Sequence, residues 1–370
     1  MIYNLGVFYR HLLFVLFFIL KSLSGQNVGC SGITLSSATN NGNYTIYTYD
    51  EGDGIRNGPQ YFGSTVYCPE NTTNPLASII IIPGYANPES SIQSWGPFLA
   101  SHGIVCMTIG TNSVFDLVET RRDALKDALI SLKSENDRPS SYLYNKLDTS
   151  LIALGGWSMG GGGAQLLAAE NQNIKAVVAL CPWIDPLVSS SALLNHNVPI
   201  LFFSGQIDAV APPNLHAEAQ YNYTPSTTTK LIYEVFLGGH TIANSPSGGQ
   251  GDVGRMAVSW LKTFLEKDSC YCPLLLSVPG SSSDYQTNLD CSAITSVQNP
   301  CLELSVFPNP FKNIITVNKS INNSPYFIYD LYGKSIQEGL VLNGKIDLSK
   351  LKKGSYFLLL KNNKSLIYKI

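Results

Sequence analysis

An apolar run followed by a serine in a glycine-rich turn constrains this chain more than any other feature. Residues Leu151 to Leu154 are apolar throughout, and the eight residues from Gly156 read GWSMGGGG. The run predicts a strand buried on both faces, and the small residues after it predict a helix lying close against that strand. A serine at such a junction adopts a strained backbone, which requires small neighbours such as Gly156 and Gly160. The sequence therefore predicts a sharp strand-to-helix turn with Ser158 at its tip.

Apolar runs alternate with helical patterns over most of the chain. Apolar residues recur at three- and four-residue steps from Leu117 to Leu132 and from Met256 to Phe264, as in amphipathic helices. The alternation predicts an α/β fold with a doubly wound, mainly parallel sheet covered on both faces. Further strands at Tyr44–Tyr49 and Thr65–Tyr67 are expected to add antiparallel pairs at one edge. The main predicted strands are Ser78–Ile82, Ile104–Ile109, Leu151–Leu154, Ala176–Leu180, Ile200–Phe203 and Leu231–Phe236.

The last part of the chain differs from the rest in its pattern of short strands and in its charge. Residues 302–370 hold ten Lys and four acidic residues, which gives this segment a net charge of 10 − 4 = +6. Because the whole chain has a net charge of −2, the residues before it carry −8. The pattern predicts a small all-β, sandwich-like domain at 302–370 after a larger domain at 26–301. Its predicted strands are Leu304–Phe307, Ile314–Val317, Tyr326–Tyr329, Lys345–Leu348 and Tyr356–Leu360.

The first 25 residues carry a pattern typical of a secretory signal peptide. Arg10 and His11 precede an apolar stretch from Leu12 to Leu20, and small polar residues follow it. About nine apolar residues cannot cross a hydrocarbon core that requires roughly 20. We therefore expect a secreted protein with no stable membrane insertion. The small net charge gives no support for a nucleic-acid partner.

An exported protein reaches oxidising compartments, so the eight cysteines of this chain can form disulfides. Cys106 and Cys181 lie in apolar runs and are expected in the core. The others that cluster late in the chain are the favoured disulfide formers, although the sequence does not give their pairing. A zinc site is the alternative, but Cys-x-Cys spacing without a nearby histidine argues against it. The clustered cysteines are Cys270, Cys272, Cys291 and Cys301, in a segment with no clear period that reads as a disulfide-tied end of the larger domain or as a linker.

A serine hydroxyl needs a histidine to accept its proton before it can act as a nucleophile. In the strand–turn–helix setting of Ser158 the partners follow in the order acid and then histidine. His240 comes after a predicted strand and two glycines, whereas the polar surroundings of His196 indicate a surface loop. Asp208, just past a predicted strand end, is favoured as the acid that orients the base; Asp185 is the rival.

Two backbone donors are expected to stabilise the oxyanion of such a reaction: the N–H of Met159 and one N–H from the loop after an earlier strand, where Pro83, Gly84 and Tyr85 lie. Too few residues separate Trp183 from Ile200 to build a folded lid. The site should therefore be open, which suits bulky or polymeric esters, with Tyr85 and Trp183 as aromatic walls. We find no clustered carboxylates that suggest calcium, and we predict no cofactor or metal.

The sequence around these residues resembles the bacterial cutinases that hydrolyse polyesters, including the poly(ethylene terephthalate) hydrolases. This family implies an α/β-hydrolase fold without a lid domain, a triad of Ser158, Asp208 and His240, and an oxyanion hole of Tyr85 and Met159. It also implies substrate binding by Tyr85, Met159, Trp183 and His216, with Trp183 as an aromatic clamp and His216 beneath it. Some members join the acid and base loops by a disulfide, where this chain has Gly205 and Ile242. The resemblance covers residues 60 to 268 and is carried by PGYANPESSIQSWGPFLASHGIVCMTIGTNS, GWSMGGGG, CPW, DAVAP and GGHTIAN.

Residues 302–370, with LELSVFPNPF and a lysine-rich end, resemble the C-terminal sorting domain of type IX secretion systems. The resemblance implies export to the cell surface or medium through that machinery. The favoured hypothesis is a monomeric, secreted polyesterase that also cleaves short acyl esters. The alternatives are a lipase or general carboxylesterase and, from a different class, a non-catalytic binding protein on a hydrolase scaffold.

Overall fold

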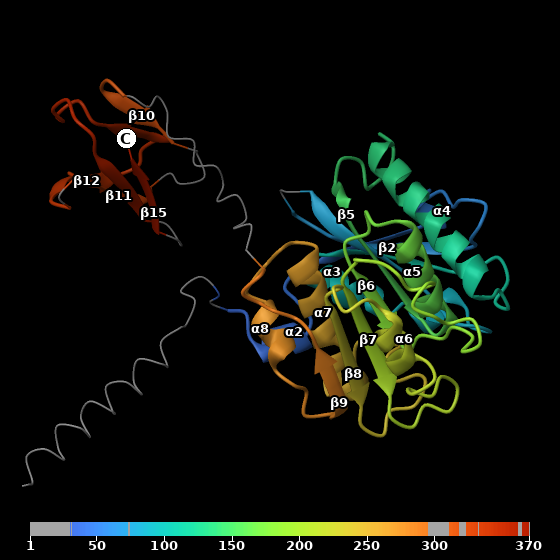
Figure 1. Ribbon diagram of the computed structural model, residues 1–370. Helices are drawn as coiled ribbons and strands as arrows, with labels where there is room; N and C mark the ends of the chain where they lie inside the picture. Colours follow the sequence, from blue (N-terminus) through green and yellow to red (C-terminus); the bar gives the residue numbers. More distant parts are fainter. Residues whose placement is uncertain are drawn as a thin grey trace, which may run out of the picture. The chain divides into compact units, whose positions relative to one another are not determined.

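The computed structural model in Figure 1 describes residues 30, 32–72, 75–294, 311–317, 323–331, 333–361 and 365–369. The chain forms two compact units, residues 1–296 and 297–370, here called the larger and the smaller unit. The predicted signal peptide at 1–25, the predicted strand Leu304–Phe307, Cys301 and the predicted domain boundary between residues 301 and 302 lie outside the described residues.

The larger unit is built on one nine-stranded sheet of order β1-β2-β4-β3-β5-β6-β7-β8-β9. The six strands from β4 to β8 in this order are parallel to one another. The strands β1 and β2 at one edge and β9 at the other pair antiparallel. The predicted mixed sheet with antiparallel strands at one edge is therefore confirmed. Its strands are β1 Ile46–Asp50, β2 Ser64–Pro69, β3 Leu76–Ile82, β4 Val105–Ile109, β5 Leu147–Trp157, β6 Val177–Leu180, β7 Ile200–Gly205, β8 Lys230–Val235 and β9 Ser282–Thr287.

Helices cover both faces of this sheet, as Figure 1 shows for α4 and α5 on one side and α3 and α7 on the other. Helix α4 buries Arg121, Leu125 and Leu132 at the three- and four-residue steps of an amphipathic helix. Two apolar clusters fill the space between helices and sheet, one on each face. Among the described helices, none is long and apolar enough to span a membrane. The helices are α2 Leu35–Thr39, α3 Trp95–Ser101, α4 Val118–Asp137, α5 Met159–Glu170, α6 Ala217–Tyr223, α7 Asp252–Phe264 and α8 Cys272–Leu276, with short 3-10 turns at Glu51–Asp53, Glu89–Ser91 and Gly248–Gly251.

The segment after residue 270, in which the sequence shows no period, contains helix α8 and strand β9. Strand β9 has the polar sequence SSDYQT and remains partly exposed along its length. It is held by pairing with β8, in which Tyr233 lies opposite Tyr285. Backbone hydrogen bonds, rather than an apolar face, specify this edge strand, so hydrophobic periodicity could not reveal it.

The smaller unit consists of a four-stranded sheet of order β12-β11-β14-β15 and a two-stranded sheet of β10 and β13. Side chains from both sheets share one core, for example Ile315 of β10, Ile328 of β11 and Leu358 of β14. The predicted β-rich module is confirmed, but the polar strand β12 and the strand β15 were not predicted. The strands are β10 Ile314–Thr316, β11 Pro325–Tyr329, β12 Ser335–Leu340, β13 Lys345–Asp347, β14 Phe357–Lys361 and β15 Ser365–Lys369.

Two disulfides cross-link the first and last described segments of the larger unit. Cys30 pairs with Cys270, and Cys272 pairs with Cys291. The two cysteines of the Cys-x-Cys sequence therefore bind different segments: Cys270 binds the chain before β1, and Cys272 binds the chain after β9. Cys30 was not among the favoured disulfide formers, because a partner 240 residues away leaves no local signal. Cys68, Cys106 and Cys181 are buried free thiols, as expected for the latter two.

We expect the Cys30–Cys270 disulfide to stabilise the larger unit more than the Cys272–Cys291 disulfide does. A cross-link restricts the unfolded chain in proportion to the logarithm of the loop that it closes, so separations of 240 and 19 residues correspond to about 5 and about 3 kcal/mol. Serine replacement of each pair, followed by urea unfolding, measures both losses. Tryptophan fluorescence reports only the larger unit, which contains all four tryptophans. A larger loss from the Cys272–Cys291 pair would contradict the expectation.

Candidate active site

Ser158 lies at the junction of β5 and α5 in a conformation that residues with a side chain rarely adopt. Its φ is 57° and its ψ is −123°. The Ser158 N–H donates to the Leu180 carbonyl of β6 at 2.8 Å, and its own carbonyl accepts the N–H of Trp183 at 2.9 Å. Strain of this kind persists only where the surroundings determine the backbone completely. These hydrogen bonds meet that condition and hold the hydroxyl above the sheet edge.

Glycines give the backbone around Ser158 the space that this turn requires. A Cβ atom on Gly156 would stand 2.2 Å from the carbonyl carbon of Gly160, and one on Gly84 would stand 2.7 Å from the Cβ of Ser158. Real Cβ atoms do not approach other atoms so closely. The requirement for small residues at Gly156 and Gly160 therefore comes from direct contact, and Gly84 is a third such position.

His240 approaches Ser158 from the loop that follows β8. Its Nε2 atom lies 2.9 Å from the Ser158 Oγ atom. The indole N–H of Trp157 donates to the His240 carbonyl at 2.9 Å, and the two rings pack with centroids 5.3 Å apart. The residue directly before the serine thus fixes the backbone and the ring of the histidine. The His240 side chain is 13% exposed, which leaves it accessible from solvent.

Asp208 lies in the loop after β7, with its side chain fully buried. Its Oδ2 atom is 2.7 Å from the His240 Nδ1 atom, and its Oδ1 atom accepts the N–H groups of Val210 and Ala211. Burial raises the pKa of this carboxyl, but the hydrogen bonds from His240 and from the two backbone N–H groups outweigh it and leave the pKa lowered. An ionised carboxylate only accepts, so Nδ1 carries the proton and the Nε2 lone pair of the neutral ring faces the serine hydroxyl.

The loops that carry Asp208 and His240 are joined without a covalent bond. The Ile207 N–H donates to the Gly238 carbonyl at 2.9 Å, and the Leu237 N–H donates to the Gln206 side chain at 3.1 Å. A Cβ atom on Gly205 would lie 2.4 Å from the Gly238 carbonyl oxygen, so glycine permits this approach. The spacing between acid and base is therefore set by backbone contact between their loops.

The two predicted oxyanion donors belong to segments that adjoin Ser158. Met159 occupies the first position of α5, where a helix has no partner for its N–H, and Tyr85 follows β3. Within the described part of the chain, neither backbone N–H donates to another protein group. The Tyr85 ring is 44% exposed and packs against Phe115 with centroids 5.6 Å apart. Sequence reasoning missed Phe115, although an aromatic residue in a polar loop after a strand was available as a signal.

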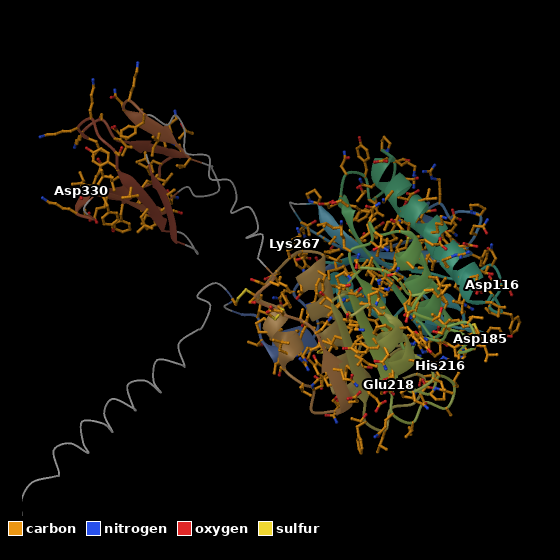
Figure 2. All side chains as sticks on the ribbon, in the orientation of Figure 1. Asp116, Asp185, His216, Glu218, Lys267 and Asp330 are labelled. Atoms are coloured by element: carbon orange, nitrogen blue, oxygen red, sulfur yellow. A yellow bond between two sulfur atoms is a disulfide. The ribbon has the colours of Figure 1, made fainter. Side chains whose placement is uncertain are left out.

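The structure brings Trp183 and His216 together, and the acid that contacts the base is Asp208 rather than Asp185. The Trp183 and His216 rings stack with centroids 5.6 Å apart and an interplanar angle of 28°. His216 is buried, which lowers its pKa and keeps it neutral at neutral pH. Asp185 accepts the N–H of Leu187 at 3.0 Å and so stabilises its own turn. Figure 2 shows Asp185 and His216 on the same side of the larger unit as Asp116.

His196 is not a surface residue, contrary to the sequence-based expectation. It is 1% exposed, and burial lowers its pKa to about 4. Its carbonyl accepts the hydroxyl of Thr228, which ties the segment before β7 to the segment before β8. The polar neighbours Asn195 and Asn197 suggested an exposed loop. The sequence does not show that the imidazole between them is buried. His196 therefore belongs to the packing of the larger unit and is absent from the Ser158 site.

No group of three or more His, Cys, Asp or Glu side chains within the described residues is arranged to hold a metal ion. The polar side chains of the site already bind one another in one line from Asp208 through His240 to Ser158. This arrangement can move a proton from the hydroxyl to the imidazole while the carboxylate balances the resulting charge.

Two family models match the chain in succession. Residues 33–292 match the family described as PET hydrolase-like, and residues 305–370 match the secretion system C-terminal sorting domain.

Curated relatives of the larger unit are ester hydrolases by name. Cutinase est1 of Thermobifida alba is 33% identical over 228 residues, which cover 62% of this chain and 73% of the relative. A cutinase of Thermobifida fusca (strain YX) is 35% identical over 217 residues, covering 59% of this chain and 68% of the relative. Bis(hydroxyethyl) terephthalate hydrolase of Streptomyces coelicolor is 32% identical over 225 residues, covering 60% and 67% respectively.

We expect His196 to destabilise the larger unit in acid. Its folded pKa of about 4 lies below the unfolded value near 6.5, so only the unfolded state gains a proton as the pH falls through this window. Stability contributed at neutral pH is then lost between pH 6.5 and 4, by about 3 kcal/mol for a shift of this size. Urea unfolding at pH 7 and pH 4 should show a smaller acid loss for His196→Leu than for wild type. Equal losses would contradict this, since the other buried histidines are present in both proteins.

Proposed function

Because the chain belongs to the PET hydrolase-like family, we propose that it is a secreted carboxylic ester hydrolase in which Ser158 is the nucleophile, His240 the base and Asp208 the orienting acid. The observation that carries the proposal is the hydrogen-bonded line of these side chains at a strand-to-helix turn, with separations of 2.9 Å and 2.7 Å. Secretion follows from the sorting domain at residues 305–370.

Acylation begins with attack of the Ser158 Oγ atom on the ester carbonyl carbon. His240 Nε2 accepts the hydroxyl proton, and Asp208 stays ionised and stabilises the imidazolium. The oxygen that becomes negative receives the N–H groups of Met159 and Tyr85, and the N-terminal end of α5 adds its positive dipole. Collapse of the tetrahedral intermediate breaks the carbon–oxygen bond, and the alcohol leaves with the proton from His240.

Deacylation repeats these steps with water as the nucleophile. His240 accepts a proton from water as the water oxygen bonds to the acyl carbon, and the same two N–H groups stabilise the negative oxygen of the second tetrahedral intermediate. Ser158 Oγ then leaves with the proton, and the carboxylic acid is released. The 13% exposure of the His240 side chain allows water to reach the position that the alcohol has vacated.

A polymeric ester suits the surroundings of this site. Residues 181–199, all of which the structure describes, form turns without a helix or strand, so no folded lid stands between β6 and β7. Exposed apolar side chains follow the carboxyl ends of five of the parallel strands, and these ends share one edge of the sheet. We define this group as the apolar rim, and it consists of Tyr85, Phe115, Leu187, Val188, Ile207, Val210, Leu215, Phe236 and Leu237.

The acid of the triad can be tested against its rival by paired amide substitutions. Asp208→Asn presents an amide to Nδ1 and favours the wrong histidine tautomer, so kcat for p-nitrophenyl butyrate should fall by about 10⁴-fold. Asp185→Asn keeps the oxygen that accepts the Leu187 N–H and should leave kcat unchanged. If Asp185→Asn abolished turnover and Asp208→Asn did not, the assignment of the acid would be wrong.

The substrate class can be tested on a soluble and a solid ester with the same enzyme preparations. Wild type should hydrolyse both p-nitrophenyl butyrate and amorphous poly(ethylene terephthalate) film, and Ser158→Ala should hydrolyse neither. In the apolar rim, Leu187→Ser with Phe236→Ser should lower product release from film several-fold, because adsorption loses apolar area, and should spare the soluble ester. Ile130→Ser with Val278→Ser removes two apolar side chains, each 60% exposed, from α4 and from the chain after α8 and is the control outside the apolar rim.

The outcome on the two substrates separates the alternatives. Activity on the soluble ester alone would favour a general carboxylesterase or lipase. Activity on neither substrate, with the fold intact by circular dichroism, would favour a binding protein on a hydrolase scaffold. A film defect shared by the control variant Ile130→Ser with Val278→Ser would remove the apolar rim from the explanation.

A further inference from the structure

Arg121 is a fully buried arginine in the first turn of α4 whose guanidinium binds backbone carbonyl oxygens. Its Nη1 atom donates to Pro83 at 2.8 Å, its Nη2 atom to Val114 at 2.9 Å and its Nε atom to Asp116 at 3.0 Å. A buried charge is costly unless it is hydrogen-bonded, and the rigid fork of a guanidinium can satisfy several acceptors at once. The side chain therefore fixes the relative positions of the loops after β3 and β4.

Two of these three carbonyls restrain the chain on both sides of Tyr85. The Pro83 carbonyl belongs to the peptide immediately before the one that carries the Tyr85 N–H. The Val114 carbonyl also accepts the N–H of Ala86 at 2.7 Å. Arg121 thus holds the segment directly at Pro83 and, through Val114, at Ala86.

The segment needs an external restraint because of the glycine that it contains. Contact with the Ser158 Cβ atom excludes any side chain at Gly84. Glycine leaves the adjoining peptides free to rotate, and one of them presents the Tyr85 N–H. Ala86 is itself left-handed, with φ at 58°, so the local backbone is not in a relaxed extended state. Within the turn, the Gly84 carbonyl of that same peptide accepts the Asn87 N–H at 3.3 Å. The contacts through Arg121 add a second restraint on the direction of the Tyr85 N–H, from outside the segment.

From this geometry we infer that Arg121 is a positioning residue that aims the Tyr85 N–H at the oxyanion formed when Ser158 attacks an ester. The inference rests on the proposed ester hydrolysis and extends it to a residue that touches no substrate. An oxyanion donor acts on charge that develops in the transition state, so its misalignment lowers kcat and leaves substrate binding unchanged.

The experiment compares Arg121→Lys and Arg121→Gln with Arg138→Lys in the full chain. Arg138 lies on the same connection at the end of α4, about 25 Å along the helix, and binds Glu135 and the Gly54 carbonyl. It is the matched control for the loss of an arginine that bridges segments. We would measure kcat and KM for p-nitrophenyl butyrate, the pH profile of kcat/KM, and the inhibition constant of n-butylboronic acid. Circular dichroism and thermal unfolding would establish the temperature at which every variant is folded.

We expect both Arg121 variants to lose roughly 10- to 100-fold in kcat, with KM within about threefold of wild type. The boronic acid, whose adduct places an oxygen in the oxyanion hole, should bind more weakly by a similar factor. The midpoint of the pH profile should not move, because the Asp208–His240 contact is retained. Should Arg121→Gln fail to fold, Arg121→Lys decides, since its ammonium group remains buried but lacks the fork that reaches all three carbonyls.

Folded Arg121 variants with the kcat of Arg138→Lys would overturn the inference, as would a fall in kcat without weaker boronic acid binding. A displaced pH profile would assign the effect to His240 and overturn it too. A wild type without ester hydrolysis would overturn the proposed function and this inference together, whereas an active wild type with unaffected Arg121 variants would overturn the inference alone.

Discussion

The strained backbone of Ser158 is the constraint on which the rest of this structure depends. Its φ of 57° is unfavourable for any residue with a side chain, and it is maintained because the N–H and the carbonyl of the serine are both bound by neighbouring segments. The same hydrogen bonds fix the end of β6 and the chain at Trp183 against the start of α5. The close packing of Gly156 on Gly160 leaves no space for relaxation. The hydroxyl is thereby directed toward His240, and its direction does not depend on a flexible side chain alone.

Charge is arranged around this fixed point so that a proton and an oxyanion can both be accommodated. The buried carboxylate of Asp208 accepts two backbone N–H groups in addition to the imidazole, which keeps its pKa low and its charge in place. The N–H groups of Met159, at the start of α5, and of Tyr85 have no protein acceptor among the described residues, and these are the two donors that we propose for the oxyanion. Arg121 binds the carbonyls of Pro83 and Val114, and we infer that it restrains the Tyr85 donor through them. In the proposed reaction, the Asp208 and His240 side chains are already oriented by the contacts that the structure shows, so little reorganisation is required.

The two units have separate apolar cores and match separate families. The larger unit buries an apolar cluster on each face of its sheet, and the disulfides at Cys270 and Cys272 bind Cys30 and Cys291. The smaller unit closes two small sheets over its own core, and its family match is to a secretion signal. Disulfides are favoured in the oxidising compartments that an exported protein reaches. The disulfides and the sorting domain are therefore both consistent with export from the cell.

The sequence by itself determined the parallel strands, their covering helices and the turn at Ser158, because these depend on local apolar periodicity and on glycine spacing. The order of the candidate triad followed from the strand–turn–helix setting of the serine. The sequence also led to Asp208 and His240, since strand ends at one sheet edge must converge. Only the tertiary structure decided the Cys30–Cys270 pairing, the strand β9, the burial of His196 and the carbonyl contacts of Arg121. Polar side chains and backbone groups that find their partners across long separations leave no periodic trace along the chain, so their roles become visible only when the folded segments meet.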